Sequence, residues 1–414
     1  MRNRLMSKIV KQKSLSRFGR IIVLTGARQT GKTTLVKQLF SDYEYLSIED
    51  PVTRSTFLSL NAQQWKSLYP KAILDEVQKE ASIIESIKAT YDQWEDTRYV
   101  LLGSSQLLLM EKVRETLAGR CTILEIFPLT LPELQTQSWD DEIPESLYVK
   151  EIQNNSQIDY LPSFLLDKRM AQKLQAYNYY LQIGGYPAVS GDETMDEKYE
   201  WLKNYVRTYL ERDIRDLASF RDLDSFIELQ KYLAINTANL INASSIGNML
   251  GINIKTVQRY IKYFEISYQG IELQAWSRNH NKRLIKTPKY HYLDHGVLQA
   301  VIGKRGGMTG NEYESAIISE LYKQAKNSQI DVRFFFLRTH DGKEVDLLME
   351  FSDHYLAFEI KMTSKVSKTD AKHLIGLEAI LDKPVRKAFV LSNDPQTTYF
   401  GENIVAIHAA MFLG

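Results

Sequence analysis

Length, composition and cysteine content exclude several classes of protein. The chain has 414 residues, too many for one hydrophobic core, and we expect three domains. With 44% hydrophobic and 25% charged residues it has a globular composition, and no apolar run approaches the roughly 20 residues of a membrane span. Cys121 is the only cysteine, which excludes an intramolecular disulfide and a cysteine zinc cluster. With no recognisable targeting signal, these features predict a cytoplasmic protein that does not bind a membrane.

The formal net charge is only +1, so any affinity for nucleic acid must come from local basic patches. Two stretches qualify. No acidic residue precedes Asp42. Residues 278–291 contain no carboxylate and five basic side chains, Arg278, Lys282, Arg283, Lys286 and Lys289.

The first predicted strand (21–25) and the first predicted helix after it (32–40) flank a phosphate-binding motif. The apolar, β-branched run of the strand ends at Gly26, and apolar residues at helical spacing follow Lys32. The segment matches G-x-x-x-x-G-K-[ST], and we expect it to contact a nucleotide through Gly26, Ala27, Arg28, Gln29, Thr30, Gly31, Lys32, Thr33 and Thr34.

Each part of this motif has a physical role. The glycines let backbone N–H groups curl round phosphates, and the helix N-terminus adds a favourable dipole. Lys32 supplies a positive charge to the β- and γ-phosphates, and Thr33 offers its hydroxyl to Mg²⁺. A glycine-rich turn could match by chance, but the flanking strand and helix argue against it. We therefore predict an ATP site.

A second apolar strand (72–76) ends in two carboxylates that complete this site. We expect Asp75 to hold Mg²⁺ through water and Glu76 to act as general base on the attacking water. Two acids after a strand are often a solvated turn. Here only one further strand candidate (43–48) separates them from the phosphate-binding motif, which favours the catalytic interpretation.

Two more positions are candidates on weaker grounds. Ser104 follows the predicted strand 99–102 and could sense the γ-phosphate, or it could belong to a plain Gly-Ser turn. Arg120 precedes the predicted strand 121–124 and could neutralise transition-state charge, in its own subunit or a neighbour's. A surface arginine that closes a helix explains Arg120 equally well.

Together these motifs resemble a known family. Residues 26–34 (GARQTGKTT), 73–78 (ILDEVQ), 101–105 (LLGSS), 117–120 (LAGR) and 127–134 (FPLTLPEL) are similar to AAA-superfamily ATPases of bacteria and archaea with a poorly characterised C-terminal region. The resemblance runs the length of the chain. It implies a five-stranded core with an additional strand between the strands of the two nucleotide motifs, and it strengthens the roles of Ser104 and Arg120.

The middle of the chain begins with a predicted helix (172–181) that stops at Gly184-Gly185-Tyr186-Pro187. The composition of this segment indicates a helix-terminating turn. In the resembled family a Gly-x-Pro at this place is similar to a lid motif that touches the adenine. Tyr186 and Pro187 are therefore either nucleotide contacts or purely structural residues.

Two short predicted helices (244–251 and 254–264) with a tight turn indicate a helix-turn-helix. The second helix would present Lys255, Gln258, Arg259 and Lys262 outward, where DNA-reading side chains lie. Predicted strands 271–273 and 284–286 bracket a basic stretch that includes Lys282 and Arg283, as a wing would. We predict a winged helix, which either binds DNA or only packs against other domains.

The last segment alternates strands and helices. We expect a helix (312–326), three strands (332–337, 344–349 and 355–360), a helix (369–381) and two strands (386–391 and 404–407). Asp346 lies inside one strand, and alternation puts Glu359 and Lys361 on the same side of the next. Two carboxylates and a lysine can hold Mg²⁺ and orient a hydroxide at a phosphodiester, and Glu314 could add a fourth group.

This constellation resembles the PD-(D/E)xK nuclease superfamily. The matching residues are Glu314, Asp346, Glu359 and Lys361. The sequence departs from the pattern in having no proline before Asp346, a position that the superfamily keeps loosely. A charged edge of a sheet, or a nuclease fold without activity, are the alternatives.

The predicted fold class is α/β, with a parallel-sheet P-loop ATPase core (1–170), a helical lid and winged helix (171–305) and a restriction-endonuclease-like domain (306–414). One hypothesis is an ATPase that gates Mg²⁺-dependent DNA cleavage, in defence or mobile-element biology. The other is an ATP-driven switch that binds DNA or a protein partner without cleaving. Both leave room for a homo-oligomer.

Overall fold

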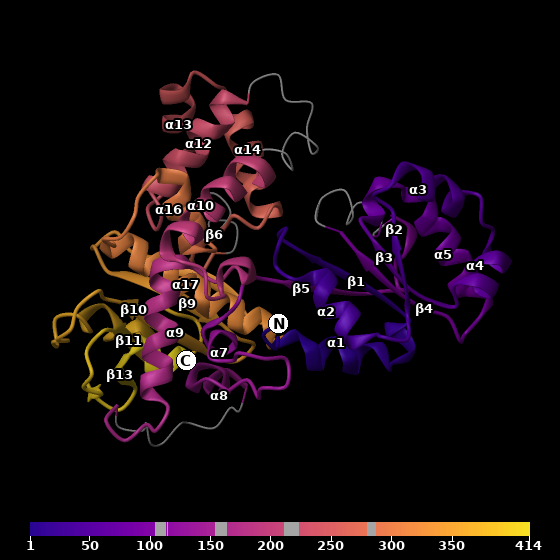
Figure 1. Ribbon diagram of the computed structural model, residues 1–414. Helices are drawn as coiled ribbons and strands as arrows, with labels where there is room; N and C mark the ends of the chain where they lie inside the picture. Colours follow the sequence, from indigo (N-terminus) through magenta and orange to yellow (C-terminus); the bar gives the residue numbers. More distant parts are fainter. Residues whose placement is uncertain (104–112, 114, 154–163, 211–222, 280–286) are drawn as a thin grey trace.

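The computed structural model describes residues 1–103, 113, 115–153, 164–210, 223–279 and 287–414. Two β-sheets organise the chain, one of five strands and one of eight. In Figure 1 the five-stranded unit lies to the right, the larger sheet to the lower left, and the helices of the middle segment above that sheet. The N-terminus and C-terminus are drawn close together at the centre.

The first sheet has the order β2-β3-β4-β1-β5, and all its strand pairs are parallel. Its strands are β1 (Ile21–Gly26), β2 (Glu44–Ser47), β3 (Lys71–Asp75), β4 (Arg98–Leu102) and β5 (Thr122–Ile126). β4 lies between β1 and β3, which carry the two predicted nucleotide motifs. The expectation of five strands with one inserted between the motif strands is confirmed.

Helices cover both faces of this sheet because alternate residues of each strand point to opposite sides. Ile22 and Leu24 of β1 pack with α1 (Met6–Ser14) and α2 (Lys32–Leu39). Ile21 and Val23 pack on the other side with α3 (Pro51–Leu58), α4 (Ala62–Leu68) and α5 (Ala81–Gln93). Short 3-10 turns at η1 (Arg17–Gly19) and η2 (Val77–Lys79) complete this α/β unit.

A series of helices links the two sheets. They are α7 (Leu131–Leu134), α8 (Leu147–Gln153), α9 (Met170–Ile183), α10 (Met195–Tyr205), α12 (Asp224–Ile235), α13 (Ala243–Leu250), α14 (Ile254–Ile266), α16 (His295–Ile302) and α17 (Gly310–Asn327), with η3 (Pro187–Val189) and the π-helical turn η4 (Val206–Leu210) between them. The predicted helices at 172–181, 244–251, 254–264 and 312–326 are confirmed as α9, α13, α14 and α17.

The second sheet is mixed and has the order β12-β13-β11-β10-β9-β8-β6-β7. Its strands are β6 (Gly270–Ala275), β7 (Lys289–Tyr292), β8 (Arg333–Arg338), β9 (Glu344–Glu350), β10 (Tyr355–Ile360), β11 (Val385–Ser392), β12 (Thr398–Tyr399) and β13 (Ile404–His408). The short helix α18 (Ala409–Leu413) follows, with every residue buried. All five strands predicted in this segment are present.

Two features differ from the sequence-based expectation, and a third cannot be compared with it. Residues 369–381 do not form a helix but two 3-10 turns, η5 (Lys372–Leu374) and η6 (Leu377–Ala379), separated by Gly376 in a left-handed conformation (φ +72°) that interrupts a right-handed helix. The predicted strand 284–286 lies outside the described residues, and the strand that pairs with β6 is β7. β6 also pairs with β8, so the hairpin is part of the C-terminal sheet and not a separate wing.

Hydrophobic packing does not follow the predicted boundaries at 170 and 305. Phe127, Leu131 and Tyr148 belong to the same core as α9, α14, α17 and the C-terminal sheet. Tyr148, for example, packs edge-on against Phe358 of β10. The segment after β5 therefore packs against the rest of the chain, whereas the division into three domains stays a prediction.

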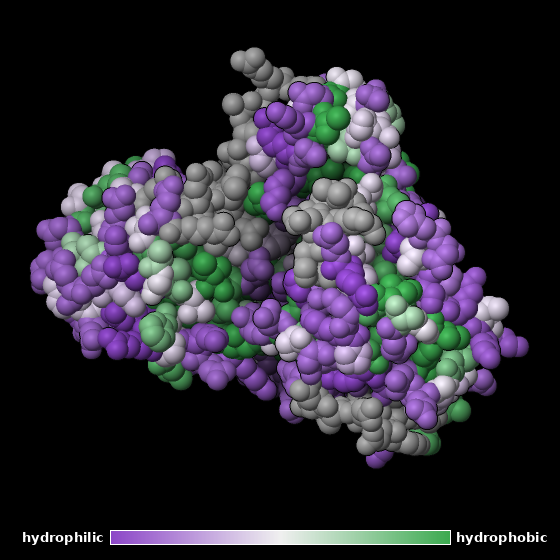
Figure 2. Space-filling model, turned by 180° about the vertical axis from the view of Figure 1, so that it is seen from behind, coloured by the Kyte–Doolittle hydropathy of each residue, from purple (hydrophilic) through white to green (hydrophobic). Residues whose placement is uncertain are grey.

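The surface agrees with a two-lobed molecule. Figure 2 shows the five-stranded unit as a lobe set apart from the rest by a notch, with mostly hydrophilic residues on the face in view and apolar residues in small groups. Among the described residues, no helix combines the length and the hydrophobicity that a bilayer crossing requires.

Candidate functional site

The loop between β1 and α2 forms a cradle for phosphates. Gln29 and Gly31 have positive φ values of 63° and 86°, and Gly31 caps α2 without a side-chain hydrogen bond to its first N–H groups. The Lys32 ammonium donates to Gly26 O and Ala27 O, both at 2.8 Å, and is therefore held inside the loop. Uncapped helix N–H groups with a lysine above them form a site for an anion. These residues fit a nucleotide phosphate.

The two predicted Mg²⁺ residues are in direct contact. Thr33 Oγ1 donates to Asp75 Oδ2 at 2.8 Å, and Tyr45 OH donates to the same oxygen at 2.7 Å. Burial and the Asp75 carboxylate raise the pKa of Tyr45, so this residue stays a neutral donor. A hydroxyl beside a carboxylate is suited to Mg²⁺. Sequence reasoning missed Tyr45, although parallel pairing of β2 with β3 brings it to this edge of the sheet.

Glu76 lies next to Asp75 in a conformation that few residues adopt. Its φ is 57°, and its carboxylate accepts from Gln78 Nε2 at 2.5 Å. Left-handed backbone outside glycine is costly and is kept only where the surroundings hold it. Here the backbone N–H of Glu76 donates to Asp75 Oδ1 at 3.0 Å. The predicted general base is therefore held in place beside the predicted Mg²⁺ residue.

Arg4, which the sequence analysis did not single out, holds the far side of the cradle. Its guanidinium donates to Thr30 O and Phe127 O, both at 2.6 Å, and pairs with Glu133 Oε1 at 3.0 Å. Arg4 is only 2% exposed. The one available signal was the run of basic residues before Asp42. A buried arginine with these partners joins the phosphate loop to the segment after β5.

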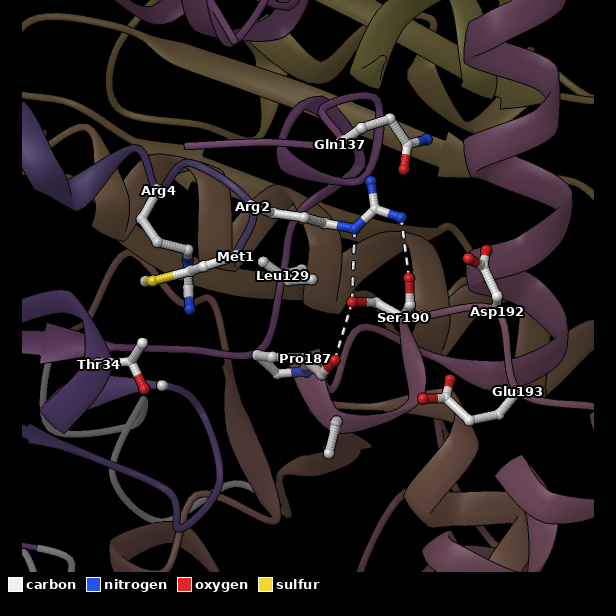
Figure 3. Close-up of a pocket in the computed structure, with 13 residues that line it drawn as sticks. Met1, Arg2, Arg4, Thr34, Leu129, Gln137, Pro187, Ser190, Asp192 and Glu193 are labelled. Carbon is white, nitrogen blue, oxygen red and sulfur yellow. Dashed lines mark hydrogen bonds between the residues drawn. The ribbon is translucent and has the colours of Figure 1, made fainter. Parts of the chain in front are cut away.

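Beside the cradle lies a pocket of about 370 Å³ (Figure 3). Its lining includes Gly31 and Thr34 of the phosphate loop, Pro187, and the charged side chains Arg2, Arg4, Asp192 and Glu193. In Figure 3 the Arg2 guanidinium points to Ser190, with 2.9 Å between Arg2 Nη2 and Ser190 O. The volume lies in the range of small-ligand pockets. Its position next to the phosphate loop suits a nucleoside.

Only one of the two nucleotide contacts predicted in the Gly-Gly-Tyr-Pro segment lines the pocket. Pro187 lines the pocket. Tyr186 is buried, with its hydroxyl 3.1 Å from Tyr205 OH, and it is not among the pocket residues. Tyr205 in turn donates to Arg28 O at 3.2 Å. The ring of Tyr186 packs against the rings of Trp201 and Tyr205.

Gly184 is required where this segment begins, and we expect Gly184→Ala to destabilise the protein strongly. Its φ is +81°, and an added Cβ would overlap the buried Asp294 carboxylate, which accepts from Gly185 N at 2.7 Å. Strain and overlap together are expected to cost at least about 3 kcal/mol. Gly303→Ala is the matched control, with φ +68° and open space, and should cost about 1 kcal/mol. Equal shifts of the urea midpoint in both variants would contradict this explanation.

The structure does not bring Arg120 to the nucleotide site of its own chain. It precedes β5, and Thr122 pairs with Ile22 near the start of β1, whereas the phosphate loop follows the end of β1. Arg120 Nε instead pairs with Asp92 at 2.7 Å, close to the end of α5. The suggested role within its own subunit is therefore wrong, because parallel strands place their two ends on opposite edges. Ser104 lies outside the described residues.

A tyrosine links the phosphate-loop strand to the predicted helix-turn-helix. Tyr268, just after α14, lies 2.9 Å from Thr25 Oγ1 and donates to Glu125 Oε1 at 3.0 Å. Thr25 is the residue before Gly26. Tyr268 has φ 60° and is 5% exposed, so it is held in an uncommon conformation against β1 and β5. This contact was not visible in the sequence.

α14 presents the predicted DNA-reading side chains to solvent. Lys255, Gln258, Arg259 and Lys262 are all exposed, while Val257, Tyr260, Ile261 and Phe264 are buried. Lys262 pairs with Glu265 at 3.0 Å. Lys282 and Arg283 lie outside the described residues. Lys289, counted with the basic stretch, is 4% exposed and bonded to carboxylates, so it is not part of a basic surface.

The environment of Glu272 in β6 predicts that the stability of the protein depends on pH. Burial and the neighbouring Glu265 raise its pKa from 4.5 to about 7. The folded state therefore binds this proton more tightly than the unfolded state, and the free energy of unfolding falls as pH rises from about 4.5 to about 7. Glu272→Gln should raise the melting temperature at about pH 8 by a few degrees and much less near pH 5. Glu228→Gln, at an exposed position of α12, should give no such difference.

The C-terminal sheet brings together the four residues predicted there. Asp346 and Glu359 lie one position beyond the paired residues Leu347 and Phe358 of β9 and β10. Lys361 Nζ lies 2.6 Å from Glu359 Oε2 and 3.6 Å from Asp346 Oδ2, and Ile360 N donates to Asp346 Oδ2 at 2.8 Å. The same-side placement of Glu359 and Lys361 is confirmed.

Glu314 reaches this cluster from α17 but pairs with a different lysine. Lys289 Nζ lies 3.1 Å from Glu314 Oε1 and 2.8 Å from Glu344 Oε1. Neither Lys289 nor Glu344 was among the predicted site residues. Burial, and then the neighbouring Asp346 carboxylate, raise the pKa of Glu314 and of Glu359 to about 8. The cluster is therefore a crowded set of carboxylates that needs positive charge.

The fit to a cation rests on the Asp346–Glu359 pair. Glu359 is 1% exposed, and its buried Oε1 accepts no hydrogen bond from any described residue, although His373 Nδ1 lies 3.6 Å away. A buried carboxylate oxygen without a hydrogen bond suits a cation that has oxygen ligands. In the described part of the chain, no group of three or more His, Cys, Asp or Glu side chains is arranged to hold a metal ion. The residues fit one cation on two carboxylates, not a site built from three.

Three family models match successive parts of the chain. Residues 19–135 match the family described as AAA domain. Residues 174–307 match a domain of unknown function, DUF8612, and residues 309–412 match another, DUF4143. Uncharacterized proteins of Mycobacterium tuberculosis and Mycobacterium bovis are each 23% identical over 370 residues, covering 86% of this chain and 74% of the relative.

Among solved structures, a Walker-type ATPase of Pyrococcus abyssi is similar, with 15% identity, a TM-score of 0.45, and coverage of 73% of this chain and 96% of that chain. The ORC2 protein of Aeropyrum pernix has 13% identity, a TM-score of 0.23, and coverage of 78% and 93%. These scores are too low to establish a common fold. The AAA-domain match, together with the parallel sheet and its phosphate loop, identifies residues 19–135 as an AAA-type P-loop domain and supports an ATP-hydrolysing enzyme.

Proposed function

We propose that this chain is an ATP-hydrolysing switch in which the nucleotide controls the binding of DNA by the segment around α14. The observation that carries this proposal is the contact of Tyr268 with Thr25 and Glu125, because it joins the strand before the phosphate loop to the end of α14. Nucleotide binding and DNA binding would then act on one shared element.

ATP would be held by the residues of the cradle. Lys32 and the uncapped N–H groups of α2 would contact the phosphates, and Thr33 and Asp75 would hold Mg²⁺, which lends charge to the β- and γ-phosphates. Glu76, fixed by Gln78, would orient the attacking water and accept its proton. The pocket lined by Pro187 and Arg2 would take the nucleoside.

DNA would contact the exposed face of α14. Three of the four predicted contacts there are basic, and the apolar side of the same helix is buried in the shared core. A basic helix face fixed to a rigid body is suited to phosphates and base edges. Lys282 and Arg283, expected from the sequence to contact DNA, belong to the same proposal.

The decisive experiment compares Tyr268→Phe with Tyr322→Phe. Both tyrosine rings lie 5.8 Å from the ring of Phe127, but it is the Tyr268 hydroxyl that bonds to Thr25. For the wild type we expect the affinity for a DNA duplex to differ at least about fivefold between ATP and ADP, measured by fluorescence anisotropy. Tyr268→Phe should reduce this ratio to below about twofold, because its link to β1 is lost. ATP hydrolysis should persist in this variant.

Tyr322→Phe should keep the wild-type ratio. A wild-type DNA affinity that is the same with ATP, with ADP and without nucleotide would overturn the proposed switch. A ratio that Tyr268→Phe leaves intact would place the coupling elsewhere.

Cleavage of DNA is a second proposed activity, favoured by the placement of Asp346 and Glu359 together with Lys361. Asp346 and Glu359 would hold Mg²⁺, which would polarise the phosphodiester. Lys361, 35% exposed and charged, would orient the attacking water or contact the phosphate. Without this activity the chain would be the switch alone, acting on DNA or on a protein partner.

Two further features belong to the proposal. Arg120, remote from its own phosphate loop, would serve the nucleotide site of a neighbouring copy in a homo-oligomer. A cytoplasmic location stays a prediction.

A further inference from the structure

The cluster on the C-terminal sheet contains a lysine that nothing in the proposed function uses. Lys289 comes from β7, at one end of the sheet order, and its ammonium lies between Glu314 and Glu344. Burial lowers its pKa, but Glu314, Asp346 and Glu344 outweigh burial and raise it. Lys289 therefore places a buried ammonium group within hydrogen-bond distance of two carboxylates.

The two lysines of the cluster differ in how far their side chains are exposed to solvent. Lys361 is 35% exposed and can leave its partners when another cation arrives. The Lys289 side chain is 5% exposed, so its ammonium cannot withdraw into water without breaking its ion pairs with Glu314 and Glu344. Glu314 and Glu344 are thus committed to an internal cation, whereas Asp346 and Glu359 remain available.

The other charged groups around the cluster support the same division. Glu344 has a second cation beside it, because Arg338 Nε lies 3.9 Å from Glu344 Oε2. Asp346 and Glu359 share the more exposed Lys361. Among the described residues, no group of three or more His, Cys, Asp or Glu side chains is arranged to hold a metal ion, which agrees with a site of two carboxylates.

We propose that Lys289 takes the place of a second metal ion, so that the cluster binds a single divalent cation on Asp346 and Glu359 and Glu314 is not a metal ligand. The inference rests on the proposed function in assuming that the cluster takes a divalent cation. Lys289 is then a positioning residue, because its ammonium keeps the carboxylates of Glu314 and Glu344 away from the metal ion.

Mn²⁺ binding to the full chain, followed by electron paramagnetic resonance without nucleotide, tests this inference. All proteins would carry Asp75→Asn, which removes the carboxylate of the phosphate-loop site. We expect one ion bound per chain at the cluster. Asp346→Asn and Glu359→Gln should each weaken binding at least about tenfold, whereas Glu314→Gln should change it less than about twofold.

Lys289→Met, which keeps the length of the side chain without its charge, should add a second bound ion or tighten the first at least about tenfold. Lys289→Met combined with Glu314→Gln should restore the single ion. Lys372→Met, at an exposed position of the same domain, is the control and should match the parent protein. Thermal melting of each variant shows which are folded, and Glu314→Gln decides the question even if Lys289→Met does not fold.

Three outcomes would overturn the inference. They are loss of Mn²⁺ in Glu314→Gln comparable to Asp346→Asn, unchanged binding in folded Lys289→Met, and no ion at the cluster of the parent protein. The proposed cleavage fails separately: a chain that binds one Mn²⁺ as described but cuts no DNA would contradict the nuclease activity and leave the single-ion site intact.

Discussion

Replacing Lys32 by alanine is expected to reduce ATP hydrolysis at least about 100-fold, the largest effect of any single change at the nucleotide site. The Lys32 ammonium is held at 2.8 Å from Gly26 O and Ala27 O, directly above the start of α2. Lys32 is the one lysine of residues 26–34, so the variant loses the lysine charge expected at the β- and γ-phosphates. Phosphate release from ATP and the binding of a fluorescent nucleotide measure the loss.

The control for Lys32→Ala is Lys13→Ala, at an exposed position of α1. This variant should hydrolyse ATP at the wild-type rate. Thermal melting shows whether the variant is folded. A folded variant with slow hydrolysis has lost the charge of Lys32, whereas a destabilised variant has also lost the structure of the loop. Hydrolysis by folded Lys32→Ala at the wild-type rate would contradict the assignment of this loop as the ATP site.

Replacing Lys361 by alanine is expected to abolish the proposed DNA cleavage, with a rate at least about 100-fold below that of the wild type. Its ammonium lies 2.6 Å from Glu359 and 3.6 Å from Asp346, so its removal takes a positive charge from the position where a phosphodiester would bind. Nicking and linearisation of supercoiled plasmid with Mg²⁺ or Mn²⁺, with and without ATP, provide the measurement.

Lys372→Ala removes an exposed lysine from the same domain and should cleave like the wild type. Two results would end the nuclease proposal. One is equal cleavage by wild type and Lys361→Ala, which would point to a contaminating enzyme. The other is no cleavage by the wild type under any nucleotide condition, which would leave the nucleotide switch as the function of the chain.

The sequence predicted the elements of both sheets better than their connections. The five strands of the first sheet and the five expected in the last segment are present because apolar periodicity and turn residues are local signals. The prediction of a helix at residues 369–381 was wrong, because apolar spacing does not reveal the left-handed conformation of Gly376. The pairing of β6 with β8 could not be predicted, since its paired residues, such as Gln274 and Phe335, lie 61 positions apart and give no local signal of pairing.

The placement of Arg120 shows a different limit. An arginine before a strand was compatible with a role at the nucleotide site in its own subunit or a neighbour's. Only the pairing of β5 with β1, which puts the start of β5 at the edge away from the phosphate loop, decided against its own subunit. Strand order is a property of the folded sheet and not of the motif.

What the sequence predicted by itself is the phosphate-binding motif and the side-by-side placement of Glu359 and Lys361. Residues 26–34 carry their roles in nine consecutive positions, and strand alternation alone puts Glu359 beside Lys361. Only the tertiary structure placed Arg4 against Glu133, 129 positions away, Tyr268 against Thr25, 243 positions away, and Lys289 against Glu314. Contacts of that kind depend on how helices and sheets pack, which spacing along the chain does not encode. These contacts join the phosphate loop to the segment after β5, β1 to the end of α14, and β7 to α17.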